Sequence, residues 1–484
     1  MSSARTIELA SGSRLSARFR RPLIPAAAIG AVLGGASFYV TATGSRRGVF
    51  VLLLLLVPFV LALVGHVERV LLAVVVLDTA FQWDANLGYH ADLARLGALG
   101  GLNVSASTFA LAGLYALWLV DRRQIQRHVA RARLALPGLV YLGVLALSIT
   151  VAADEELAGY EVVLLLQLVL LFVYLVCRLR TSSDVRFLMV MLMATLLLES
   201  VVVIVSHFQT SLPLPWTQIQ TQVGADGAFR TGGTIGSPNN AGSFLALLLA
   251  PTLSYLLLPI SGWTRRLAMI AFGVGTAALV FTLSRAGWLS FGISTAVLTF
   301  VVARSDATRA RAVVAAIAGT FVLVLPFSPL VSARLQHSDR GAARGRIPLD
   351  RLAYRMVESK PVLGIGANNF ALEIPAYAGP DFSRDWLYTV HNRYLLTWAE
   401  AGPAALLAFL WFLLSALARA RRTWGTRHLL YAPLALGCGA AIAGQMLGDM
   451  PVDPFQSRAQ QQLLWVLAAL ATATYVLAKR KAPE

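Results

Sequence analysis

Long runs of apolar residues, separated by short polar segments, dominate the chain. Runs such as VFVLLLLLVPFVLALVG from Val49 and VVLLLQLVLLFVYLVC from Val162 approach the ~20 apolar residues that cross ~30 Å of hydrocarbon. In lipid, backbone N–H and C=O groups must bond within their own segment, which favours helices. The pattern therefore predicts an all-α, polytopic integral membrane protein with about fourteen (12–14) transmembrane helices.

The predicted helices leave polar segments between them on alternate sides of the membrane. The helix that carries Asp78 and the glycine-rich helix near Cys438 depart most from the apolar pattern. The predicted helices cover residues 23–42, 48–65, 69–83, 105–121, 134–151, 161–177, 186–206, 240–259, 266–283, 287–303, 310–328, 398–418, 429–448 and 461–478.

Four segments follow from this arrangement. A basic tail covers residues 1–22, and eleven helices follow over residues 23–331, with an outer loop at 207–239. A large polar loop covers residues 332–397, and three helices and the C-terminus occupy 398–484. If the chain does chemistry, we expect it in the large loop.

One segment of the large loop has helical periodicity. In IPLDRLAYRMVESK the apolar residues recur on one helical face, at Leu349, Leu352, Ala353, Met356 and Val357. This spacing predicts an amphipathic helix at the membrane surface, ended by Pro361 and by the turn-forming GIGANN.

Composition supports the membrane assignment. Hydrophobic residues make up 57% and charged residues 13% of the chain, and the mean hydropathy is +0.67. The first apolar run follows the basic residues 14–21 and precedes further spans instead of a cleavage site, so we expect a permanent first span.

The distribution of charge predicts the orientation. With the N-terminus inside, the cytoplasmic segments hold 26 of the 41 lysines and arginines and six of the 24 acidic residues, as the positive-inside rule requires. The pI of about 10.6 is then a signal of topology, and no aromatic-interleaved basic patch points to nucleic acid. The segments 207–239 and 332–397 are predicted to be extracytoplasmic.

Metal and disulfide chemistry have no support in the pattern. Cys177 and Cys438 lie in or beside apolar runs, and the seven histidines lack ligand spacing. We therefore expect no metal and no cofactor.

Two arginines outside the large loop are candidates for binding an anion. Arg230 precedes TGGTIGSPNN, in which glycines let N–H groups approach an anion, and a helix is expected to begin near Asn239. Such a loop could equally be only a turn. Arg285 interrupts two apolar runs within a short SRAG link, where it must reach water, a lipid phosphate or a substrate anion.

His391, in VHNRYLLTWAEAG, is the candidate general base, because a histidine can accept a proton near neutral pH. Tyr394 and Glu400 follow closely enough to orient the histidine or bind substrate. A lone histidine could also be structural. Arg351 and Arg355, one helical turn apart, could grip a phosphate together or could pair with Glu358 or lipid headgroups.

The ordered set of motifs resembles a known family. RTGGTIGSPNNAGSFLALLLAP, SRAGW, KPVLGIGANNF and VHNRYLLTWAEAGP are similar in order and spacing to the O-antigen ligase and polymerase superfamily of bacterial envelope glycosyltransferases. The resemblance covers roughly residues 225–415, and the first third of the chain shows only generic apolar helices.

The resemblance implies transfer of a glycan from an undecaprenyl-pyrophosphate donor to a sugar hydroxyl, on the outer face of the bacterial inner membrane, without a metal. It implies that Arg230 and Arg285 hold the pyrophosphate and that His391 acts as the base. Asn239, Tyr394 and Glu400 would orient or bind sugar. The implied partners are the lipid-linked oligosaccharide, an acceptor glycan or glycolipid, membrane lipids and a regulator of chain length.

Three other functions remain open. Family ligases, which transfer the glycan to lipid A core, are usually shorter, which favours a polymerase of O-antigen or exopolysaccharide. A flippase or transporter is expected to carry midplane charges and inverted repeats, which this sequence does not show. A cell-wall glycosyltransferase of the shape and division type would need an aspartate base in an outer loop.

Overall fold

The computed structural model describes residues 66–120, 129–208, 221–223, 229–260, 262–305, 307–336, 346–378, 388–448 and 457–480. The chain forms two compact units, residues 1–71 and residues 72–484. Only the start of helix α4 (Val67–Phe81) is described in the first unit. The predicted helices at 23–42 and 48–65 lie outside the described residues, and all that follows concerns the second unit.

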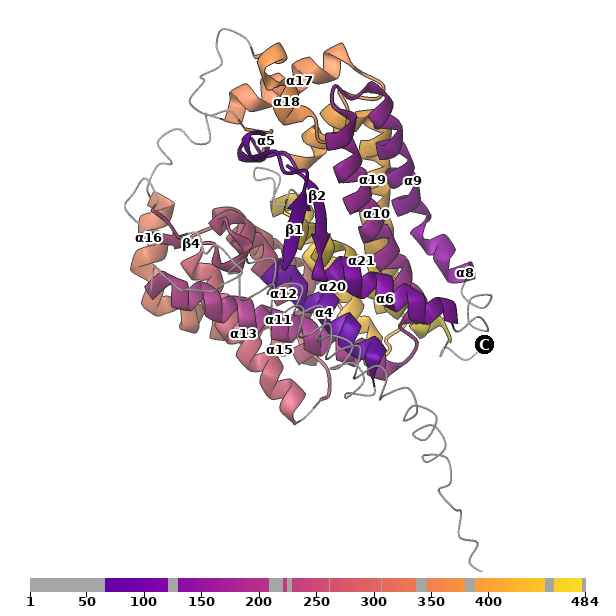
Figure 1. Ribbon diagram of the computed structural model, residues 1–484. Helices are drawn as coiled ribbons and strands as arrows, with labels where there is room; N and C mark the ends of the chain where they lie inside the picture. Colours follow the sequence, from indigo (N-terminus) through magenta and orange to yellow (C-terminus); the bar gives the residue numbers. More distant parts are fainter. Residues whose placement is uncertain are drawn as a thin grey trace, which may run out of the picture. The chain divides into compact units, whose positions relative to one another are not determined.

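The second unit consists mainly of helices (Figure 1). Two short antiparallel pairs of strands accompany them, β1 (Asp84–Leu87) with β2 (Leu102–Ser105) and β3 (Thr221–Val223) with β4 (Phe229–Thr231). After α4 the helices are α5 (Ala91–Arg95), α6 (Ala106–Val120), α8 (Val129–Ala132), α9 (Leu136–Leu147), α10 (Glu155–Arg178), α11 (Ser182–Phe208), α12 (Pro238–Leu256), α13 (Trp263–Phe281), α14 (Arg285–Ala303), α15 (Ala307–Val324), α16 (Ser328–Gln336), α17 (Arg346–Ser359), α18 (Phe370–Tyr377), α19 (Arg393–Gly425), α20 (Tyr431–Gly448) and α21 (Arg458–Arg480).

Eight helical segments of the described part are long and apolar enough to cross a membrane. They are Arg133–Val151, Glu155–Arg178, Ser182–Phe208, Trp263–Phe281, Arg285–Ala303, Val313–Gln336, Arg393–Gly425 and Arg458–Arg480. The chain is therefore an all-α, multi-pass membrane protein, as predicted. Helices α4, α6, α12 and α20 also form where spans were predicted, but the total of fourteen stays a prediction.

The predicted end of the helix over 310–328 is wrong. The helix expected over 310–328 continues through a 3-10 turn, Leu325–Phe327, into α16 and reaches Gln336. Pro326 lies in the first turn of that 3-10 segment, where a missing N–H costs little. The start of the predicted large loop is thus helical.

Small residues bring three helices close together. An added Cβ at Gly287 of α14 would collide with the backbone of Gly242 in α12. Further along the same side of α14, Ser290 and Ser294 occupy the space beside the glycines of α20, such as Gly444. Such small-residue contacts let helix backbones approach in a membrane, so the first turns of α12 and α14 lie beside the end of α20.

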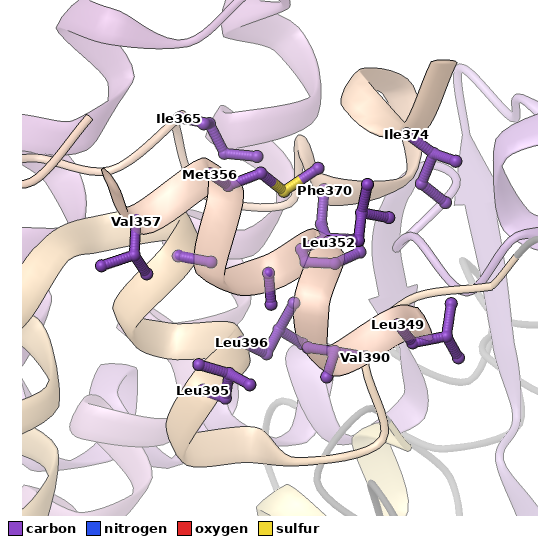
Figure 2. Packing of buried hydrophobic residues seen from close by; sticks show 12 residues of the cluster. Leu349, Leu352, Met356, Val357, Ile365, Phe370, Ile374, Val390, Leu395 and Leu396 are labelled. Carbon is purple, nitrogen blue, oxygen red and sulfur yellow. The ribbon is translucent and has the colours of Figure 1, made fainter. Parts of the chain in front are cut away.

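The predicted amphipathic helix is α17, and all five predicted apolar residues are buried. Figure 2 shows them packed with Phe370 of α18 and with Leu395 and Leu396 of α19. Helices α18 and α19 cover this apolar face, and the position of α17 at the membrane surface stays a prediction.

A break in α19 holds the GIGANN turn. Gly402 has φ of 78° and lies inside α19, and Pro403 follows it without an N–H. The carbonyls of Ala399 and Glu400 thereby lose their helical partners and accept hydrogen bonds from the N–H groups of residues 365 and 366, both at 2.9 Å. The turn is fixed against the start of α19 by backbone bonds.

Candidate functional site

Arg230 lies in β4 and reaches the ends of two helices. Its Nη2 donates to Oδ1 of Asn239 at 2.7 Å, and its Nε donates to the carbonyl of Thr282 at 3.4 Å. Asn239 is in the first turn of α12, and Thr282 caps the end of α13. The structure therefore brings Arg230, Asn239 and the α13–α14 link together.

Arg285 is the first residue of α14 and contacts α16. Its Nη2 donates to the carbonyl of Arg334 at 2.6 Å, and Nε of Arg334 donates to the carbonyl of Leu283 at 3.2 Å. These reciprocal bonds attach the end of α16 to the α13–α14 link. Arg230, Arg285 and Arg334 are called the arginine cluster below.

Two helix N-termini add positive potential to the arginine cluster. Ser237 caps α12 by accepting from the N–H of residue 240 at 3.1 Å, and Ser284 caps α14 by accepting from Gly287 at 3.2 Å. A helix N-terminus carries a partial positive charge that favours anions. Three guanidinium groups and two helix N-termini therefore make this region suited to a polyanion.

A buried carboxyl group supports the glycine-rich loop before α12. Glu199 of α11 accepts from the N–H of Thr234 at 3.1 Å and also from its hydroxyl. Gln82 donates to the carbonyl of the same threonine at 2.9 Å. The loop between Arg230 and α12 is thereby held in one conformation, which fixes the position of the arginine.

His391 lies just before α19 and has a defined tautomer. Its Nδ1 is 3.0 Å from the carbonyl of Thr389, and because a carbonyl can only accept, Nδ1 carries the proton. The neutral ring then has an unprotonated Nε2. Burial lowers the pKa of His391, the contact with Thr389 opposes this, and the positive charge of Arg346 lowers the pKa further.

Tyr394 connects this end of α19 to α20. Its hydroxyl donates to the carbonyl of Met446 at 3.0 Å. Since Gly444 and Gly448 of α20 contact α14, the end of α20 lies between Tyr394 and the helix that begins with Arg285. The arginine cluster and His391 thus belong to two groups of contacts that α20 joins.

The remaining predicted residues have other contacts. Glu400 is buried and accepts from the N–H of Phe370 at 3.1 Å, so it orients the end of the GIGANN turn. Arg355 donates to the carbonyl of Tyr377 at 3.1 Å, and both Arg351 and Arg355 are exposed on α17. That these two arginines bind phosphate stays a prediction.

Sequence reasoning missed several polar residues that build this region. The sequence pattern singles out neither Arg334 nor Glu161, yet Glu161 forms an ion pair of 2.9 Å with Arg393. Asn368 bonds both backbone groups of Leu99, at 2.7 and 2.9 Å. The sequence feature that could have pointed to Asn368 is the pair of asparagines in GIGANN, because a turn does not require two of them.

A family model matches part of the chain. Residues 268–410 match the family model described as O-antigen ligase. The match begins in α13 and ends in α19, so it includes Arg285, α17, the GIGANN turn and His391. A search of curated proteins found no match.

Proposed function

We propose that this chain, a member of the O-antigen ligase and polymerase superfamily, is a polysaccharide polymerase of O-antigen or exopolysaccharide. It would move a glycan from undecaprenyl pyrophosphate to a sugar hydroxyl of another lipid-linked glycan, at the outer face of the bacterial inner membrane. The observation that carries the proposal is the arginine cluster at the N-termini of α12 and α14.

The arginine cluster would act on the donor. When the bond between the anomeric carbon and the pyrophosphate oxygen breaks, negative charge develops on that oxygen. Guanidinium groups give charge-assisted bonds to phosphate oxygens, and fixed donors in a site shielded from water stabilise such charge strongly. Arg230 and Arg285 are held at their positions by Asn239 and α16, so little reorganisation is needed at the moment of reaction.

His391 would act on the acceptor. Its unprotonated Nε2 takes the proton of the acceptor hydroxyl while the hydroxyl oxygen bonds to the anomeric carbon. The electron pair of the broken bond leaves with undecaprenyl pyrophosphate. Because attack and departure occur on opposite faces of the carbon, the configuration inverts.

The decisive experiment uses purified full-length protein and an undecaprenyl-pyrophosphate oligosaccharide alone, in the presence of EDTA. A ladder of longer products is expected from a polymerase. Consumption of the donor only after lipid A core is added would indicate a ligase instead. Flipping of the donor without a new glycosidic bond would indicate a transporter.

Two variants test the assigned residues in the same assay. We expect Arg285→Ala and His391→Ala each to lower the rate by ~10²-fold or more. Arg304→Ala, at the other end of α14, where the guanidinium lies over Phe300, is the matched control and should keep the rate. Near-normal polymer from Arg285→Ala or His391→Ala would overturn the assignment of that residue.

A further inference from the structure

A polar cavity lies beside His391 and is distinct from the arginine cluster. Its volume is about 230 Å³. It is lined by residues from five parts of the chain: the β1–β2 connection, α10, the GIGANN turn, the start of α19 and the start of α21. The lining residues include Tyr89, Glu161, Thr389, Arg393 and Glu400.

The cavity is connected to the proposed base. Thr389, whose carbonyl accepts from Nδ1 of His391, lines the cavity, and so does Arg393, two residues beyond the histidine. His391 therefore lies between two lining residues in the chain. The histidine itself is not a lining residue, and its hydrogen bond to Thr389 is the contact that links its ring to the cavity wall.

The lining can hydrogen-bond hydroxyl groups. Glu161 and Arg393 form an ion pair of 2.9 Å, with only 11% and 10% of their side chains exposed. Carboxylates accept from hydroxyls and guanidinium groups donate to them, so the rigid pair offers both kinds of partner. Tyr89 adds a ring that is 58% exposed, which can cover the apolar face of a sugar.

The charge of the cavity separates it from the arginine cluster. Its lining has two carboxyl groups, those of Glu161 and Glu400, and one guanidinium group, that of Arg393. A phosphate or uronic acid would meet no excess of positive charge there. The cavity suits an uncharged sugar, whereas the arginine cluster suits pyrophosphate.

We propose that this cavity is the subsite for the acceptor, and that it holds an uncharged sugar ring with its reactive hydroxyl directed to His391. This inference depends on the proposed function, because it names the place of the second substrate in that reaction. A small number of polar groups that converge beside an aromatic ring is typical of sites that fix the orientation of a small ligand.

The test introduces one thiol into the cavity wall. Ala98 lines the cavity and is half-buried, and the native cysteines Cys177 and Cys438 are buried, so Ala98→Cys gives a single reactive position. The probe is the oligosaccharide released by mild acid from the lipid-linked pool of the cell, which lacks pyrophosphate. At about ten times its dissociation constant it should slow maleimide labelling about tenfold.

Two further variants make the test specific to the cavity. In the Ala98→Cys background, Tyr89→Ala should raise the dissociation constant of the probe about tenfold, so that protection falls from about tenfold to about twofold. Tyr354→Ala removes an equally exposed tyrosine on α17 that does not line the cavity, and it should leave protection unchanged. Inorganic pyrophosphate should not protect the thiol. Ala94→Cys, also in the wall, replaces Ala98→Cys if that variant does not fold.

The outcomes separate this inference from the proposed function. Transfer activity without protection, or protection by pyrophosphate, would overturn the acceptor subsite and leave the proposed function standing. Protection without any transfer would overturn the proposed function and leave a sugar-binding cavity. Loss of protection in Tyr354→Ala would show that the effect is not local, and would overturn the subsite.

Discussion

At the scale of the residue, the environment of His391 determines the pH at which the proposed base works. Burial and the charge of Arg346 lower its pKa below the ordinary value of about 6.5. A lowered pKa keeps the imidazole neutral, and able to accept a proton, as the pH falls below that value. We predict that kcat/KM stays constant down through pH 6.5 and declines only at lower pH, as measured by transfer rates across a pH series.

A variant at Arg346 reverses part of this shift. Arg346→Gln removes a positive charge that disfavours the imidazolium, so the pKa of His391 should rise and the decline in kcat/KM should begin at higher pH. Arg304→Ala, remote from the histidine on the chain, serves as the control. An acid limb that does not move in Arg346→Gln would contradict the role of His391 as the titrating base.

Single residues differ in how far the sequence identifies them. Arg285 can be identified from the sequence, because a short link between two apolar helices does not require a charged residue. Glu161 cannot be identified from the sequence, because an acidic residue near the end of an apolar helix is also found where the start of a helix is simply exposed. Its partner Arg393 is 232 positions away, and no local pattern joins residues that only tertiary packing brings together.

At the scale of the element, the break in α19 is the feature with the clearest consequence. Gly402→Ala would place a side chain at φ of 78° and in collision with the carbonyl of Val362. We predict a loss of about 1–3 kcal/mol in the free energy of unfolding, measured by denaturant titration in detergent. The carbonyls of Ala399 and Glu400 could then no longer hold the GIGANN turn.

A second glycine of α19 provides the matched control. Gly425 has open space where a Cβ would lie, so Gly425→Ala should be neutral or stabilising by up to about 1 kcal/mol. Equal effects of the two substitutions would mean that the break in α19 is not needed for the fold.

The sequence predicts which helices form more accurately than it predicts where each helix begins and ends. Apolar runs predict α9, α10, α11, α13, α14 and α21 correctly. In lipid the backbone polar groups must be paired within the protein, and a helix does this within one segment. The apolar face of α17 is also correct, since its five residues repeat at helical spacing. The start of α19 at Arg393 is not predicted, because polar residues such as Arg393 and Glu400 interrupt its first turns. The apolar residues of these turns pack against α17 and α18 instead of lipid.

At the scale of the whole molecule, an ion pair joins α4 to α21 across 380 positions of the chain. Nη1 of Arg458 is 2.9 Å from Oδ2 of Asp78, and both side chains are buried. We predict that Arg458→Met lowers the free energy of unfolding by ~3–5 kcal/mol, because it removes the guanidinium partner of the buried carboxylate of Asp78 and also of Asp84, at 3.3 Å. The loss of stability can be measured on heating, as a fall in the temperature at which Cys177 and Cys438 begin to react with a fluorescent maleimide.

The double variant tests whether the pair or the packing matters. Asp78→Asn combined with Arg458→Met removes both charges of this pair, so part of the lost stability should return, while Asp84 still lacks its guanidinium partner. Additive losses in the double variant would mean that the two side chains act independently, and that the ion pair does not hold the first described helix to the last.

The sidedness of the molecule links the fold to the proposed reaction. Within residues 72–484, the N-termini of α12 and α14 and the end of α20 meet beside the start of α19, and the basic residues of the opposite ends predict that those ends are cytoplasmic. In spheroplasts, a membrane-impermeant maleimide should label Ala98→Cys and should not label Gly425→Cys until the membrane is opened. The buried native thiols give little background. The reverse pattern would place the arginine cluster and His391 towards the cytosol, away from the side on which the lipid-linked glycan is extended, and a polymerase could not then work from this site.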